Sequence, residues 1–88
     1  YPELPEPHNN LGVLYAAQGD YAKAQASFEM ALRDNPSYAV AHENLGDVLL
    51  HLAKQSYQRA LGLNPKQFSV QQKIQRLSPA LELSERKP

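Results

Sequence analysis

The sequence predicts an all-α fold made of two stacked copies of one helical hairpin, the second copy being shortened. Asn-Leu-Gly occurs at residues 10–12 and again at residues 44–46, an offset of 34 residues. A second group of residues recurs at an offset of 29, including the Asn-Pro pairs at 35–36 and 64–65. Apolar residues follow helical spacing between these markers. With 88 residues, the chain has the length of one small domain at most.

The repeated unit resembles the tetratricopeptide repeat (TPR), a 34-residue helix–turn–helix. The first copy, residues 5–38, matches the family pattern at His8, Leu11, Gly12, Tyr15, Ala24, Phe28, Ala31 and Pro36. The second copy, residues 39–65, lacks five residues in its middle and matches at His42, Leu45, Gly46, Ala53, Tyr57, Ala60 and Pro65. The resemblance implies an α–α superhelix of stacked hairpins.

The resemblance also assigns the two ends of the chain. Pro2 falls where a preceding repeat would end, so residues 1–4 are expected to be the end of that repeat. Residues 66–88 are expected to form a capping helix and tail, because helical arrays need a final helix with a polar outer face.

Local signals predict the first hairpin. The first helix is expected over residues 6–18, with Pro5 and Pro7 in its first turn, where a missing N–H costs little. Gly19 and Asp20 turn the chain. The second helix is expected over residues 21–33, which are rich in Ala and Gln, and it closes at Asn35-Pro36.

The third helix has no stop signal where the family places its turn. Residues 48–61 contain no Gly, Pro, Asn or Asp, and the apolar spacing continues through them. We therefore predict one fused helix over residues 38–62, with Ser37 as its N-cap. Two alternatives are a very tight turn at residues 52–54, or a turn whose five residues are absent from this sequence.

The fourth helix is predicted over residues 65–77. Asn64 is a suitable N-cap, and Pro65 suits the first helical position. Ser78-Pro79 is expected to end the helix, leaving residues 80–88 as a frayed tail.

Two glycines predict close contacts between helices. Gly12 and Gly46 carry no side chain, so each lets a second helix approach. Within the first hairpin, Leu11, Tyr15 and Phe28 are expected to fill the remaining space.

A fused helix predicts self-association. It cannot fold back on itself, so a second copy of the chain would cover its apolar face in a domain-swapped homodimer. Residues 1–47 carry a net charge of −5 and residues 48–88 a net charge of +5, which favours an antiparallel pair. The alternative is a monomer with a tight kink. The expected self-association residues are Leu52, Ala53, Tyr57, Ala60 and Leu61.

The TPR resemblance also implies a concave groove lined by the first helix of each repeat. Some TPR domains bind chaperone C-termini through a basic clamp, but this chain has Glu43 and Asp47 where that clamp needs positive charge. We therefore predict a scaffold or adaptor that binds a basic or mildly apolar protein segment. The expected groove residues are Glu6, Asn9, Val13, Ala16, Ala17, Val40, Glu43, Asp47, Leu50 and His51.

Composition argues against other classes of function. The absence of Cys excludes disulfides and thiol nucleophiles, and the net charge of zero argues against a nucleic-acid partner. No apolar run is long enough to insert into a membrane. No catalytic, cofactor or metal motif is present, so we expect no enzyme activity and no cofactor. The style of the repeats is similar to bacterial cell-envelope TPR proteins, which favours the periplasm.

Overall fold

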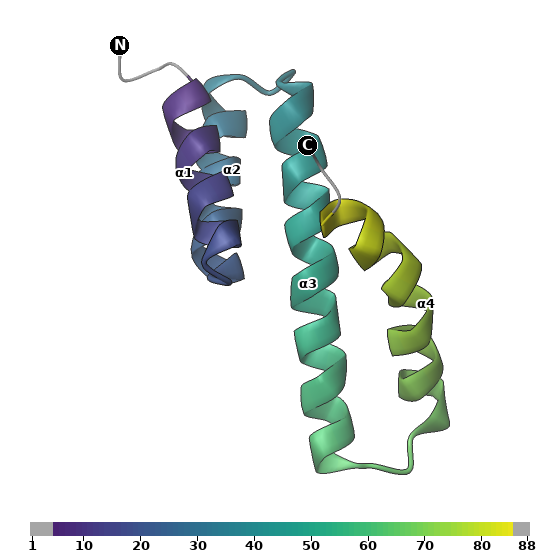
Figure 1. The fold of residues 1–88 in the computed structure, drawn as a ribbon. Helices are drawn as coiled ribbons and strands as arrows, with labels where there is room; N and C mark the ends of the chain where they lie inside the picture. Colours follow the sequence, from purple (N-terminus) through teal and green to yellow (C-terminus); the bar gives the residue numbers. More distant parts are fainter. Residues whose placement is uncertain (1–4, 86–88) are drawn as a thin grey trace. The chain divides into compact units, whose positions relative to one another are not determined.

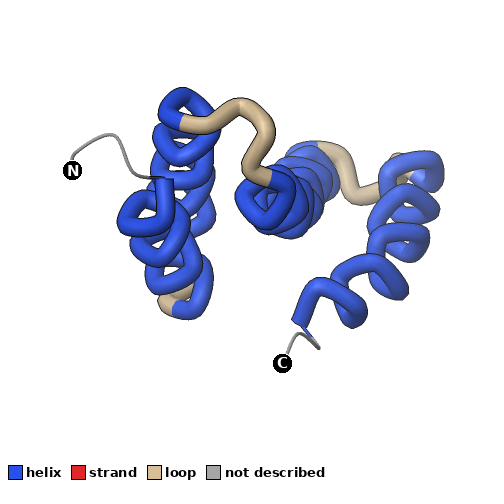
Figure 2. The backbone as a smooth tube through the Cα atoms, turned by 90° about the horizontal axis from the view of Figure 1, so that it is seen from above, coloured by secondary structure: helices blue, strands red, loops and turns tan. Residues whose placement is uncertain are grey.

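The computed structural model describes residues 5–85, and within that range the chain is helical, with no strand (Figures 1 and 2). Its helices are α1 (Pro5–Ala17), α2 (Tyr21–Asp34), α3 (Ala39–Leu63) and α4 (Phe68–Glu85). The predicted all-α fold is confirmed. Pro2 and the end of a preceding repeat lie outside the described residues. The described residues up to Leu49 form one compact unit, and those from Leu50 onward form a second.

The first unit contains the hairpin of α1 and α2. Gly19 adopts a φ of +80°, a left-handed conformation that a residue without a Cβ adopts readily. Asp20 then caps α2, because its carboxylate accepts a hydrogen bond of 3.2 Å from the Lys23 backbone N–H. The two helices lie side by side (Figure 1), and α2 buries a stripe of Ala24, Ser27, Phe28 and Ala31.

Phe28 packs against the backbone of α1 at Gly12. A Cβ placed on Gly12 would lie 2.5–2.8 Å from three carbon atoms of the Phe28 ring. Phe28 is 1% exposed, so its ring has little room to move away. The predicted close approach at Gly12 is therefore confirmed, and it sets the distance between the helices of the first repeat.

Helix α3 is continuous over 25 residues, a length of about 37 Å. The predicted fused helix is confirmed, and the alternative of a tight turn at residues 52–54 is wrong. Its N-terminal part belongs to the first unit and buries Ala41 and Val48. Its remaining residues and α4 form the second unit, a helical hairpin (Figure 1).

The prediction for Gly46 is wrong. A Cβ placed on Gly46 meets no atom of the described residues within 4 Å. The reason is the fused helix: Tyr57, the repeat equivalent of Phe28, lies on α3 itself and cannot turn back onto Gly46. The second repeat thus keeps its glycine without the aromatic contact that the first repeat makes.

Both Asn-Pro pairs form turns that delay the next helix. The side-chain oxygens of Asn35 and Asn64 accept hydrogen bonds from the backbone N–H groups of Ser37 and Lys66, at 3.1 and 3.4 Å. Such Asx turns occupy the residues just after the asparagine. The predicted N-caps at Ser37 and Asn64, and the helical position of Pro65, are therefore wrong: α3 begins at Ala39 and α4 at Phe68.

The two turns continue with matching contacts at the start of α3 and α4. His42 Nε2 lies 2.9 Å from the Pro36 carbonyl oxygen, and Gln71 Nε2 donates to the Pro65 carbonyl at 3.1 Å. The two contacts are related by the repeat offset of 29 residues. Helix α4 therefore starts in the same way as the first helix of a repeat.

Helix α4 continues through Pro79 to Glu85, so the predicted end at Leu77 and the frayed tail over residues 80–85 are wrong. Pro79 deprives the helix of one N–H donor, which disfavours it. Leu81, however, is 6% exposed, and it extends the apolar stripe of Val70, Ile74 and Leu77 past the proline. Burial of this leucine, worth about 1.5–3 kcal/mol, offsets much of the cost of the missing hydrogen bond.

We expect Gly12→Ala to lower the free energy of unfolding by about 1–3 kcal/mol, because the added methyl group overlaps the confined Phe28 ring. The control is Gly62→Ala, also within a helix, where a Cβ meets no atom of the described residues within 4 Å. Urea titration followed by circular dichroism measures both. Equal stability of the two variants would contradict the close contact at Gly12.

We expect Pro79→Ala to raise the free energy of unfolding by about 1–3 kcal/mol, because the new N–H restores a backbone hydrogen bond inside α4. Thermal unfolding of the variant and the parent chain tests this. Pro65→Ala, in the turn before α4, is the control and is expected to bring no comparable gain. A drop in stability of Pro79→Ala would indicate that α4 ends before the proline.

Candidate functional site

Helices α1 and α3 are joined within the first unit by a hydrogen bond between asparagines. Asn44 Nδ2 donates to Asn9 Oδ1 at 3.1 Å, across 35 residues of sequence. The two helices run in the same direction there (Figure 1). Of the predicted groove residues in this unit, Ala16 and Asp47 are half-buried, and the exposed ones are Glu6, Val13, Ala17, Val40 and Glu43.

Asn9 does not line an open surface. It is 5% exposed, and its side chain contributes to the contact between α1 and α3. The prediction that it faces a ligand is corrected for this reason. The repeat alone could not reveal the pair, because the offset of 34 residues relates Asn44 to Asn10 and not to Asn9.

The remaining surface of the first unit combines apolar and acidic side chains. Val13 is 48% exposed and Val40 is 50% exposed. Val13 lies one helical turn after Asn9, and Asp47 lies one turn after Asn44. The Asn9–Asn44 bond therefore places Val13 of α1 and Asp47 of α3 at a similar height along the two helices.

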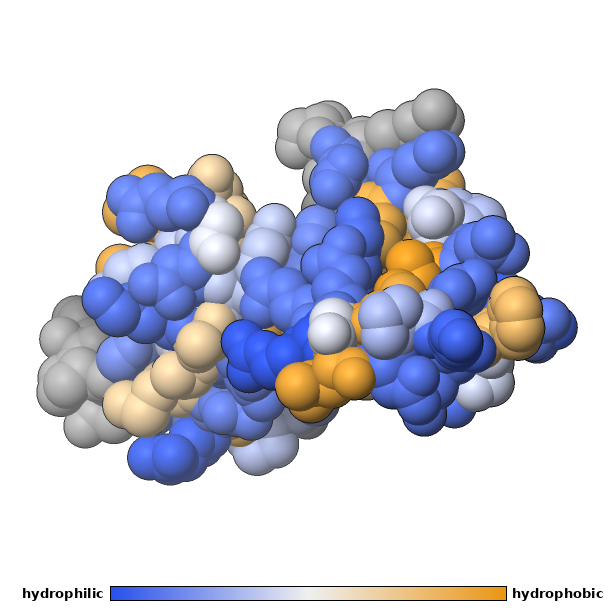
Figure 3. Space-filling model, turned by 90° about the horizontal axis from the view of Figure 1, so that it is seen from below, coloured by the Kyte–Doolittle hydropathy of each residue, from blue (hydrophilic) through white to orange (hydrophobic). Residues whose placement is uncertain are grey.

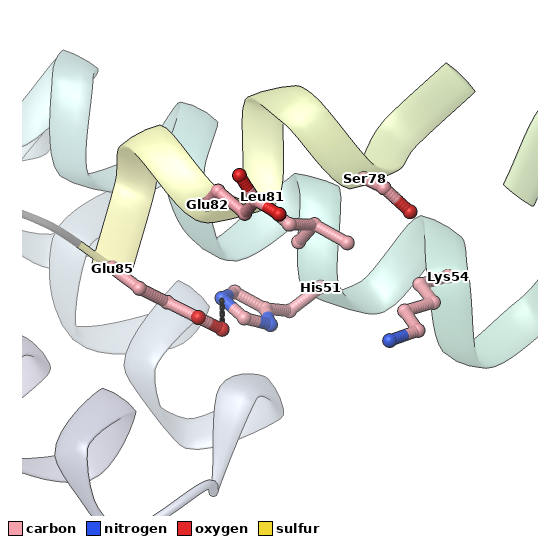
Figure 4. A pocket seen from close by; sticks show the side chains of 6 residues that line it. All are labelled: His51, Lys54, Ser78, Leu81, Glu82 and Glu85. Atoms are coloured by element: carbon pink, nitrogen blue, oxygen red, sulfur yellow. Dashed lines mark ion pairs between the residues drawn. The ribbon is translucent and has the colours of Figure 1, made fainter. Parts of the chain in front are cut away.

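Leu50 and His51, the last two predicted groove residues, belong to the second unit. His51 Nε2 lies 4.0 Å from a carboxylate oxygen of Glu85 on α4 (Figure 4). These two residues line an open, mainly polar hollow of about 230 Å³ together with Lys54, Ser78, Leu81 and Glu82. The His51–Glu85 pair spans the hairpin, which is the arrangement of a structural contact.

The predicted self-association residues lie along the second half of α3, in the second unit. Leu52, Ala53, Tyr57, Ala60 and Leu61 are each half-buried. Lys73 of α4 places its Nζ atom 5.9 Å from the centre of the Tyr57 ring, within range of a cation–π interaction. The expectation that this face projects fully uncovered is corrected, because α4 folds back beside α3 (Figure 1) and its Lys73 reaches the Tyr57 ring.

Sequence reasoning missed three exposed apolar side chains of the second unit. Leu63 and Phe68, on either side of the turn between α3 and α4, are 86% and 75% exposed, and Leu83 is 70% exposed. In the view from below, orange apolar surface lies among blue polar surface (Figure 3). Phe68 could have been found from its repeat equivalent, Ala39, which also begins a helix and is exposed.

The histidines contact other groups of the protein. His8 Nε2 lies 3.7 Å from an Asp34 carboxylate oxygen, and His42 bonds the Pro36 carbonyl. Among residues 5–85, no group of three or more His, Asp or Glu side chains is placed to hold a metal ion.

In the same part of the chain, no helix is both long enough and apolar enough to cross a membrane.

The antiparallel α1–α2 hairpin, and the recurrence of its Asn-Pro turn, define a helical repeat protein. The chain belongs to the tetratricopeptide repeat family, whose model matches residues 9–68. The family is a non-catalytic repeat that mediates interactions between proteins.

The chain is also similar to the chloroplastic tetratricopeptide repeat domain-containing protein PYG7 of Arabidopsis thaliana. The two are 35% identical over 68 residues, which cover 72% of this chain and 23% of that protein. The chain therefore spans about a quarter of the length of this relative. Because PYG7 is a plant protein, the expected likeness to bacterial cell-envelope proteins gains no support from it. No solved structure matches the chain.

We expect Asn9→Ala to lower the free energy of unfolding by about 1–2 kcal/mol, since it leaves the Asn44 side chain without its part-buried partner. A double-mutant cycle with Asn44→Ala should give a coupling energy of about 0.5–1.5 kcal/mol. The exposed neighbour Asn10→Ala is the control, with a change within about 0.5 kcal/mol. A coupling energy of zero would contradict the bond.

Proposed function

We propose that the chain is a protein-binding module that holds a basic or mildly apolar segment of another protein against α1 and the first part of α3. The observation that carries this proposal is the exposure of Val13 and Val40 at about half of their surface, on helices held together by the Asn9–Asn44 bond. A partner that packs on these two side chains would remove their apolar surface from water, which is favourable.

The acidic side chains beside these valines indicate the sign of the partner's charge. Glu43 is exposed and Asp47 is half-exposed on α3, while Glu6 is exposed on α1. The described part of the first unit has fewer basic residues, Lys23 and Arg33, and both are on α2. A segment that carries Lys or Arg is attracted to such a surface, and an acidic one is repelled.

Self-association is a second candidate function. The observation that favours it is the open surface at Gly46, where the first repeat has a packed aromatic ring at the equivalent glycine. In this role the chain is a structural unit whose partner is a second copy of itself.

A display library of random peptides, selected against the immobilised chain, tests the binding proposal. We expect selected peptides to combine Lys or Arg with apolar residues. Glu43→Lys should weaken their binding by about five-fold or more, the equivalent of about 1 kcal/mol for an exposed charge pair. Glu29→Lys, a matched reversal at an exposed position of α2, should leave binding unchanged.

Two outcomes would contradict the proposal. One is a failure to enrich any peptide over a surface that carries no protein. The other is enrichment of acidic peptides, or an equal effect of Glu29→Lys and Glu43→Lys, since neither is compatible with an acidic binding surface on α3.

A further inference from the structure

The first repeat shows how its two helices pair. Gly12 of α1 faces the Phe28 ring of α2, within 2.5–2.8 Å of a Cβ placed on the glycine. The two helices are antiparallel, so Tyr15, one turn further along α1, is at the level of Ala24, one turn earlier on α2. Gly12 and Tyr15 on one helix, with Ala24 and Phe28 on the other, thus define the pairing.

The second repeat carries all four equivalent residues on one helix. The repeat offsets relate Gly12 to Gly46, Tyr15 to Leu49, Ala24 to Ala53 and Phe28 to Tyr57. Tyr57 follows Gly46 by eleven residues of continuous helix, about 16 Å along the axis of α3. The chain therefore cannot form this pairing within itself.

The four residues make one stripe along α3. Their spacing is three, four and four residues, which keeps them on the same side of a helix. Gly46 is open, and Leu49 is 45% exposed. Ala53 and Tyr57 are half-buried, so part of each side chain is still accessible.

We infer that α3 pairs antiparallel with α3 of a second copy, with Tyr57 of each copy on Gly46 of the other. Leu49 of each copy then faces Ala53 of the other, and the two-fold axis passes between His51 and Leu52. This inference specifies the partner and the register of the self-association given above as the second candidate function, and it rests on that function.

The charges of α3 select the antiparallel direction. Its acidic residues, Glu43 and Asp47, lie in the first half of the helix, and its basic residues, Lys54 and Arg59, lie in the second half. An antiparallel pair brings each acidic half beside a basic half, whereas a parallel pair brings like charges together. The same arrangement creates two equal contacts at Gly46, as a two-fold interface requires.

Cysteine cross-linking tests the register, because the chain has no cysteine of its own. Leu49→Cys and Ala53→Cys copies, distinguished by a tag, are mixed and oxidised, and the products are separated by mass. We expect a disulfide between unlike copies at a yield about ten-fold above that of either variant alone. The oligomeric state of the parent chain is measured in parallel by sedimentation at micromolar concentrations. We expect a dimer.

A substitution at Gly46 tests the contact independently. Gly46→Leu fills the position of the Tyr57 ring and should raise the dimer dissociation constant by about ten-fold or more. Helix content should persist, since a Cβ there meets no atom of the described residues within 4 Å. Gly62→Leu, the same change on α3 away from the stripe, should leave the dissociation constant unchanged.

The possible failures are distinguishable. A parent chain that sediments as a monomer at all accessible concentrations overturns both self-association and the inferred register. A dimer in which Leu49→Cys joins to itself, or in which Leu49→Cys and Ala53→Cys do not join, overturns the register and leaves self-association standing. A dimer unaffected by Gly46→Leu, or loss of helix content in that variant, also overturns the inferred contact.

Discussion

The continuity of α3 is the constraint on which the rest of this structure depends. An ordinary repeat of this family has a turn between its two helices, and the second helix folds back to bury its face on the first. Residues 48–61 contain no Gly, Pro, Asn or Asp to end a helix, so each added residue gains another backbone hydrogen bond and the helix continues. As a result, the apolar residues of the second repeat must pack against other parts of the protein. Tyr57, for example, lies beside Lys73 of α4.

The two repeats show what a single glycine contributes in different surroundings. Gly12 allows Phe28 to reach the backbone of α1, and the ring is almost fully buried there. Gly46 has the same place in its repeat, but its surface is open within the described part of the chain. A glycine in an exposed helix carries a conformational cost of about 1 kcal/mol relative to alanine. The close contact offsets that cost in the first repeat, and a contact with a second copy would offset it in the second.

Burial at the end of the chain outweighs a local signal in a similar way. Pro79 is a strong helix breaker, yet α4 passes through it because Leu81 continues the buried stripe one turn further. The two Asn-Pro turns illustrate the opposite case, in which a local side-chain hydrogen bond wins. Asn35 and Asn64 each bond the backbone two residues ahead, and the following helix starts only after that turn. Local hydrogen bonds thus decide where α3 and α4 begin, and burial decides that α4 continues past Pro79.

The sequence by itself determined the helical class, the repeat, the bounds of α1, α2 and α3 to within about a residue, and the fusion of α3, because periodicity and the positions of helix breakers are local properties. Only the tertiary structure decided that Asn9 is buried against Asn44, that Gly46 is open while Gly12 is filled, and that α4 extends past Pro79 to cover part of α3. These outcomes depend on which surfaces meet across distant parts of the chain. The spacing of residues along one helix does not specify that, since the same Leu-Gly pattern occurs with and without a ring packed against it.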